Sequence, residues 1–106
     1  MDDLAMPPLP RTFDDLIRRV QEDKHLSLAQ RRNMASALRR FAEVDGRAGA
    51  MPCDANSVRG AIARIIPARH GITHRTWSNI VSQVRRACRS YGAANGRRYH
   101  DLLSPA

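Results

Sequence analysis

Aromatic residues are scarce in this sequence: its 106 residues include one Trp, two Tyr and two Phe. A β-sandwich core relies on aromatic and β-branched side chains, so this composition favours helices that pack through Leu, Ile, Val, Met and Ala. No apolar run approaches the roughly 18 residues of a membrane-spanning helix, and no secretory signal pattern is present. We therefore expect one all-α domain, located in the cytoplasm and without a membrane partner.

Clusters of residues that carry chemistry are also missing. We expect the two cysteines, Cys53 and Cys88, to be reduced thiols of an intracellular protein rather than a disulfide. Zinc sites need closely spaced ligand pairs. His70 and His74 have a suitable spacing, but a predicted helix start separates them. There is no Gly-rich phosphate loop and no grouping of nucleophile, base and acid. We expect no metal, no cofactor and no catalytic residue in this chain.

Acidic residues become rare after the first 23 positions. Residues 1–23 hold 3 basic and 6 acidic residues, a net charge of −3, whereas residues 24–106 hold 15 and 4, a net charge of +11. All but one of the basic residues are Arg, whose planar guanidinium fits phosphates and guanine edges. This distribution suits a nucleic-acid partner, although an Arg-rich genome composition produces the same preference for Arg.

The clearest periodicity predicts a helix from Thr73, its N-cap, to Gly92, the residue after its last turn. Apolar side chains recur along it at steps of three and four, the repeat of one helix face: Trp77, Ile80, Val81, Val84, Ala87, Cys88 and Tyr91. At about 100° per residue, the opposite face gathers polar side chains and no acid: Arg75, Asn79, Ser82, Arg86 and Arg89, with Gln83 at its edge.

Two amphipathic segments come earlier in the chain. Thr12 is the expected N-cap of a first helix that ends near residues 23–25, and Asp15 occupies the capping-box position. Ser27 is the expected cap of a second helix over residues 28–44, which turns most of its arginines outward.

A third helix and two flanking segments complete the predicted organisation. Asp54 or Asn56 caps the third helix, and Pro67 ends it. Its predicted apolar side consists of Val58, Ala61, Ile62, Ile65 and Ile66. Residues 1–11 contain three prolines and are expected to form a disordered arm without contacts. Residues 93–106 read as a linker.

Two basic helix faces form the predicted binding surface. Arg and Ser can hold phosphates, whereas Asn and Gln can read adenine in the major groove. On the last helix, the side chains expected to contact DNA are Arg75, Asn79, Ser82, Gln83, Arg86 and Arg89. Before and on the second helix they are Lys24, Arg31, Arg32, Arg39 and Arg40, with Arg31 at the rim of the core.

A charged helix face is often only solvated, and it can also dock an acidic protein. A face that serves solubility alone mixes Glu with Arg, however, and the outer face of the last helix has no acid. Double-stranded DNA is therefore the preferred partner. Two alternatives stay open, a protein-interaction module and a small stand-alone DNA-binding regulator.

The last predicted helix and the residues before it read GITHRTWSNIVSQVRRACRSYG over residues 71–92. This segment resembles the last helix of the core-binding domain of tyrosine recombinases, the phage-integrase family. Residues 26–41, LSLAQRRNMASALRRF, resemble the stretch in which such domains enter their DNA-contacting helix. Ala29 and Gln30 depart from the family, where many relatives have Pro or Thr.

The resemblance implies a small SAM-like four-helix bundle over residues 12–92, which closes over one side of DNA while a separate C-terminal domain cuts the strand. The family's catalytic set is an Arg, a Lys, a His-X-X-Arg pair and a Tyr nucleophile. None of it maps onto this chain, since Tyr91 lies on the apolar face and Tyr99 has no such motif around it. Residues 93–106 would then lead toward that catalytic domain, and further recombinase protomers assembled on DNA would be partners.

Overall fold

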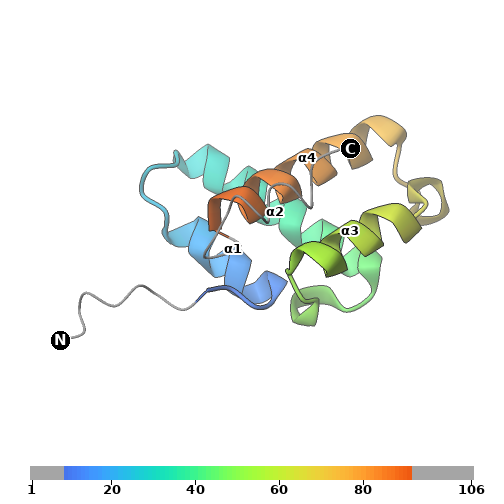
Figure 1. The fold of residues 1–106 in the computed structure, drawn as a ribbon. Helices are drawn as coiled ribbons and strands as arrows, with labels where there is room; N and C mark the ends of the chain where they lie inside the picture. Colours follow the sequence, from blue (N-terminus) through green and yellow to red (C-terminus); the bar gives the residue numbers. More distant parts are fainter. Residues whose placement is uncertain (1–8, 92–106) are drawn as a thin grey trace.

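The computed structural model describes residues 9–91. Within this range the chain forms four α-helices and two short 3-10 helices (Figure 1): α1 Phe13–Glu22, α2 Leu28–Asp45, η2 Ala48–Ala50, α3 Ala55–Arg64, η3 Pro67–His70 and α4 His74–Tyr91. The described part has a single β-bridge, between Thr12 and Pro52, and no strand. The prediction of a small all-α domain is confirmed, whereas the expected helix end at Gly92, the linker 93–106 and residues 1–8 lie outside the described residues.

The first two helices begin with reciprocal side-chain caps. The Thr12 hydroxyl accepts a hydrogen bond from the Asp15 backbone N–H, and the Asp15 carboxylate accepts one from the Thr12 N–H, both at 3.3 Å. Ser27 and Gln30 do the same at the start of α2, at 3.1 and 2.8 Å. These bonds satisfy backbone donors that have no partner inside the helix, so both predicted helix starts are confirmed.

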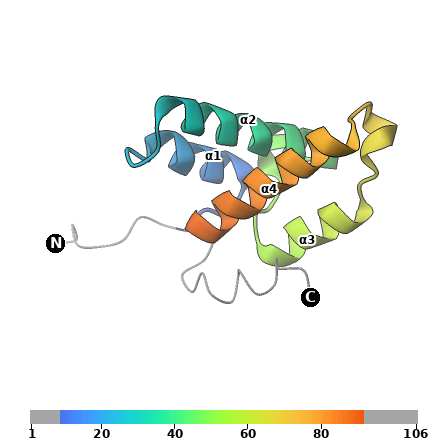
Figure 2. The same ribbon diagram turned by 90° about the horizontal axis from the view of Figure 1, so that it is seen from above.

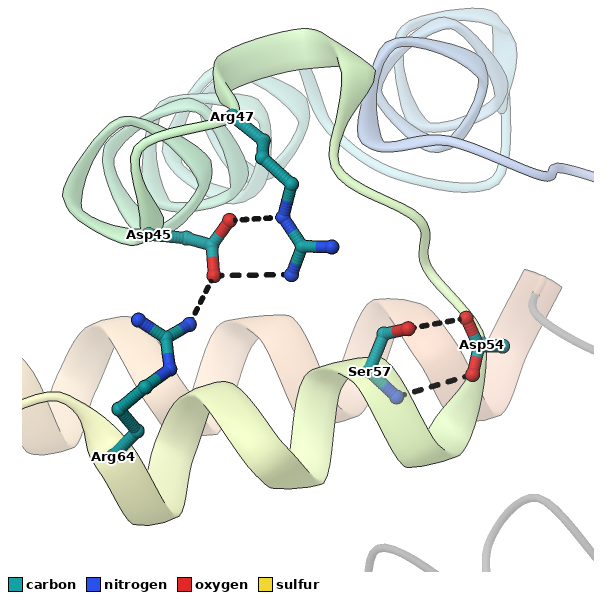
Figure 3. A network of polar contacts seen from close by, with 5 residues as sticks. All are labelled: Asp45, Arg47, Asp54, Ser57 and Arg64. Carbon is teal, nitrogen blue, oxygen red and sulfur yellow. Dashed lines mark hydrogen bonds and ion pairs between the residues drawn. The ribbon is translucent and has the colours of Figure 1, made fainter.

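The later helices are also capped by side chains. The Asp54 carboxylate accepts from the Ser57 backbone N–H at 3.0 Å and from the Ser57 hydroxyl at 2.6 Å (Figure 3). Asp54 is therefore the cap of α3 rather than Asn56. The Thr73 hydroxyl accepts from the Thr76 N–H at 3.2 Å, as predicted for α4.

Helix α3 ends earlier than predicted. Its last helical residue is Arg64, and both Ile65 and Ile66 have extended backbones. The ring of Pro67 disfavours a helical conformation for the residue before it, so the chain leaves the helix before the proline. Ile65 stays buried, but Ile66 is 49 % exposed, and the prediction that Ile66 joins the apolar side is wrong.

The core lies between α1, α2 and α4. Phe41 of α2 is fully buried and stacks on Phe13 of α1, with ring centroids 5.6 Å apart, and on Trp77 of α4, with centroids 5.4 Å apart. These three residues are named the aromatic stack. Each such pair contributes about 0.5–1.5 kcal/mol beyond the burial of its area. Three of the five aromatic residues thus meet where these helices pack together.

The chain just before α1 is part of the packed structure. Pro10 is buried, its carbonyl oxygen accepts from the Cys53 thiol at 3.3 Å, and the Arg11 carbonyl oxygen accepts from the Cys53 N–H at 3.0 Å. The Phe13 N–H donates to the Met51 carbonyl oxygen at 2.9 Å. Burial raises the pKa of the Cys53 thiol to about 12, so it stays protonated at neutral pH. The expectation of an arm without contacts is therefore wrong for Pro10 and Arg11.

The arrangement of the helices sets α4 at the exposed side of the core. Helix α4 packs against α2 and α1, and α3 lies on the side of α4 away from α2 (Figure 2). Both long helices, α2 and α4, therefore present an outward face while their inner faces share the aromatic stack.

Candidate nucleic-acid interface

Helix α4 divides into a buried stripe and an exposed arc. The buried side chains are Trp77, Ile80, Val81, Val84, Ala87 and Cys88, and Tyr91 is half-buried. The exposed ones include Arg75, Asn79, Ser82, Arg86 and Arg89, with Gln83 half-buried at the edge. The predicted separation of apolar and basic faces is confirmed, because no neighbouring helix covers the arginines.

A groove of about 750 Å³ runs between α2 and α4. Its α2 wall includes Arg39, Arg40 and Glu43, and its α4 wall includes Asn79, Ser82 and Gln83. Five of the predicted DNA-contacting residues, which come from two separate helices, therefore line one surface feature. The groove offers guanidiniums, amides and hydroxyls, and Glu43 is the acid among its lining residues.

Other predicted residues lie on the far flank of α2. Arg31 and Arg32 line a cavity of about 400 Å³ near the end of α1, where Arg39 also lines the wall. The Arg31 guanidinium donates from Nη1 to the Gln21 carbonyl oxygen at 3.3 Å, and its Nε is buried without a hydrogen-bond partner within residues 9–91. Arg31 therefore holds the last turn of α1 against α2. Lys24 is exposed in the connection between these two helices.

Three predicted arginines of α4 lie outside the groove. Arg75 and Arg86 are on the exposed arc, and Arg89 lines a third cavity between α3 and α4. Among residues 9–91, the ion pairs join Arg18, Arg47 and Arg64 to aspartates, and none involves Arg75, Arg86 or Arg89. Their positive charge is therefore available to an external anion.

The aspartate at the end of α2 is held by two other arginines (Figure 3). The Asp45 carboxylate, whose side chain is fully buried, accepts from Arg47 Nε at 2.7 Å and from Arg64 Nη2 at 2.5 Å. The Arg47 hydrogen bond, with that of Arg64, holds the pKa of Asp45 below its usual value. These two arginines tie α2 and the loop after it to α3, and we assign them no role in ligand binding.

The C-terminal turn of α4 is fixed to the α1–α2 connection. The Tyr91 hydroxyl donates to the Asp23 carboxylate, and the Arg19 guanidinium lies 5.8 Å from the centre of the Tyr91 ring. The Tyr91 hydrogen bond, followed by one from the His25 N–H, lowers the pKa of Asp23. Burial, with the same Asp23 bond, raises the pKa of Tyr91 to about 12. This contact positions α4 and keeps the Asp23 charge engaged away from the groove.

Arg85 was missed by the sequence prediction. It falls at the edge of the apolar stripe of α4, where periodicity does not separate core from surface. The structure places it in the cavity between α3 and α4, half-buried, with a buried Nε that has no hydrogen-bond partner in the described part of the chain. One signal in the sequence could have identified Arg85 as a site residue. It precedes Arg89 by four residues, and this spacing puts both side chains on one side of a helix.

Comparisons with protein-family models, curated protein sequences and solved structures find no match to this chain. None of the helices within residues 9–91 has the length and apolar character needed to span a bilayer. In the same range, no group of three or more His, Cys, Asp or Glu side chains is placed to hold a metal ion. Function is therefore inferred from the groove and from the charges around α4.

Proposed function

We propose that this domain binds double-stranded DNA and that one sugar–phosphate backbone lies in the groove between α2 and α4. The observation that carries the proposal is the convergence of Arg39 and Arg40 with the polar side of α4 in that groove. Guanidiniums form the strongest hydrogen bonds to phosphate oxygens, and hydroxyls such as that of Ser82 add weaker ones. The two arginines outweigh the single charge of Glu43.

The exposed arc of α4 supports major-groove binding. A helix of 18 residues is about 27 Å long and, with side chains, about 10–12 Å wide. The major groove is about 12 Å wide and admits such a helix. Asn79 and Gln83, near the middle of α4, would face base edges. Because α4 is straight and the DNA backbones curve around the duplex, the two ends of the helix would come close to phosphates. Arg75 near its start and Arg86 near its end would contact these phosphates.

The surface of α4 favours DNA over a protein partner. Protein interfaces depend on buried aromatic and apolar anchors. The exposed large hydrophobic residues of the described chain are Leu9, Leu28 and Ile66, and none of them is on α4. The outward side of α4 thus offers positive charge and polar groups without an apolar anchor.

We also propose, on the strength of the sequence resemblance, that the domain is the SAM-like core-binding domain of a tyrosine recombinase. It would clamp duplex DNA during integration or recombination in the cytoplasm, and it would position a separate catalytic domain beside further protomers. The helix order agrees with this proposal, and the Ser27–Gln30 cap gives α2 a firm start where the sequence departs from the family. A coding sequence that continues into a His-X-X-Arg motif and a Tyr nucleophile would support a recombinase over a stand-alone regulator.

Fluorescence anisotropy on a short labelled duplex of random sequence, repeated over a range of salt concentrations, tests DNA binding. We expect weak binding that falls steeply with salt, and the double variant Arg75→Gln/Arg86→Gln should reduce the slope of log affinity against log salt by about 1.8. Circular dichroism should show unchanged helicity. A salt slope equal to that of the wild type would refute the assignment of this face.

A polyglutamate peptide serves as competitor in the same assay. It carries negative charge without phosphates or base edges, so it should displace DNA only weakly. Equal competition by the peptide and by unlabelled DNA would favour the protein-interaction module instead.

A further inference from the structure

The cavity between α3 and α4 is a second basic site on the other flank of α4. It has a volume of about 370 Å³. Its polar lining consists of groups that can all donate hydrogen bonds, and none of its lining residues is acidic. The lining comprises Ser78, Ser82, Arg85 and Arg89, with Trp77 and Ile62 as apolar wall.

Arg85 is held in this cavity with an unused donor. Its Nε is buried and has no hydrogen-bond partner within residues 9–91, and Arg85 takes part in no ion pair there. That Nε is covered, so an external oxygen would bind the guanidinium through its Nη groups, which are not buried and have no partner within residues 9–91. Arg89, one helical turn further on, adds a second guanidinium on the same side.

We propose that this cavity binds a phosphate of the second DNA strand, on the opposite flank of α4 from the groove that receives the first. The inference builds on the proposed function. The α2–α4 groove and the α3–α4 cavity border α4 on its two sides, and Ser82 on the exposed arc between them lines both. A helix seated in the major groove has one backbone on each side at about the groove's 12 Å width.

The location of the cavity makes a phosphate of the bound duplex its expected occupant in the DNA complex. Because Ser82 joins the cavity to the groove, a duplex that occupies the groove would extend directly to Arg85 and Arg89. In this arrangement Arg39 and Arg40 hold one strand, and Arg85 and Arg89 hold the other. Arg85 is then a phosphate-binding residue, and α4 is clamped from both flanks.

The variant Arg85→Gln tests the cavity directly. Removing one phosphate contact should lower affinity and reduce the salt slope by about 0.9. Arg89→Gln, at an exposed position that should not affect folding, should give the same reduction. Arg59→Gln removes an equal charge from an exposed position on α3 that does not line the cavity, and it should leave the slope nearly unchanged. Slopes equal to the wild type in both Arg85→Gln and Arg89→Gln would overturn the inference.

A hybrid duplex with uncharged methylphosphonates along one strand tests the strand assignment. With both flanks engaged on different strands, the wild-type salt slope on this hybrid should be clearly lower than on ordinary DNA. An identical slope would mean that both flanks contact one strand, and it would overturn the inference while leaving DNA binding by the groove intact.

Trp77 provides a readout that does not depend on DNA. It is the single tryptophan of the sequence and part of the cavity wall. Titration with inorganic phosphate at constant ionic strength should shift its emission to a plateau, and Arg85→Gln should abolish the shift. If the wild type bound no duplex, the proposed function would fail, and this titration would still decide whether the cavity takes phosphate. Absence of a shift would reject the phosphate site.

Discussion

Replacing both arginines of the α2 wall, as Arg39→Gln/Arg40→Gln, should weaken DNA binding by a predictable amount. Both side chains are exposed, line the groove and take part in no ion pair within residues 9–91. Six contacts, from these two and from Arg75, Arg85, Arg86 and Arg89, predict a salt slope of about −5.4, and four predict about −3.6. For a fourfold rise in salt, affinity should fall about 1,800-fold for the wild type and about 150-fold for the variant.

The assay is anisotropy of a labelled duplex at several salt concentrations, together with circular dichroism to verify folding. The matched control is Arg18→Gln/Arg59→Gln, which removes the same net charge from α1 and α3 outside the groove. Arg18 makes only an exposed pair with Asp15 at 3.5 Å, so its loss should barely affect stability. The control should retain a slope near that of the wild type.

Two results would refute this reasoning. If the control flattened the salt dependence as much as the groove variant, binding would follow total charge rather than the geometry of α2 and α4. If the groove variant kept the wild-type slope, the backbone would not lie between these helices, even if the protein still bound DNA.

The remaining predictions concern stability. Phe41→Ala, at the centre of the aromatic stack, should lower the free energy of unfolding by about 3–5 kcal/mol in urea titrations, because it leaves a cavity. Thr12→Ala removes the cap of α1 and should lower it by about 1 kcal/mol. Asp45→Asn should be less stable than the wild type at neutral pH. Since the folded pKa of Asp45 lies below its usual 3.8, its contribution is complete above that pH and disappears as the pH falls through the folded pKa, so the difference between the two proteins should shrink in acid.

Each of these stability predictions has a clear opposing result. A loss below about 1 kcal/mol for Phe41→Ala would show that the stack is not a packed core. An unchanged unfolding midpoint for Thr12→Ala would mean that the capping box does not operate in solution. For Asp45→Asn, a difference from the wild type that stayed constant from neutral pH into acid would rule out the ionised carboxylate as the stabilising group.

The helices could be predicted from the sequence because their signals are local. Thr12, Ser27 and Thr73 cap neighbouring backbone groups within three residues, and the apolar steps of α4 need only the geometry of one helix. The exposed arc of α4 follows from the same periodicity. Ile66 was assigned wrongly because the effect of Pro67 on the residue before it ended the helix sooner than the apolar pattern did.

The division of the arginines among three cavities could not be read from periodicity. A helical pattern shows that a side chain points outward, but the fold decides which neighbour lies beside it. Arg40 lines the groove with α4, Arg31 and Arg32 line the cavity near α1, and Arg39 borders both. Arg85 stands at the edge between core and surface, where only the position of α3 gives it a cavity.

Contacts between distant parts of the chain were also beyond the sequence patterns. The pairing of Pro10 and Arg11 with Cys53 joins segments more than forty residues apart. The proline content of residues 1–11 predicted an extended arm, but nothing local indicated a partner for Pro10 and Arg11. The packed domain therefore begins before the first cap.

The bond between Tyr91 and Asp23 adds a polar anchor to the buried stripe that sets the angular position of α4 about its own axis. Sliding the helix by one residue would turn it by about 100° and direct guanidiniums toward the interior. The Tyr91 bond ties the last turn of α4 to the end of α1, so the helix cannot rotate without breaking it. A synthetic peptide of the same sequence would keep the charges without a defined side to present. Packing of the inner stripe, with the terminal tyrosine bond, thus gives the charged face of α4 a fixed direction.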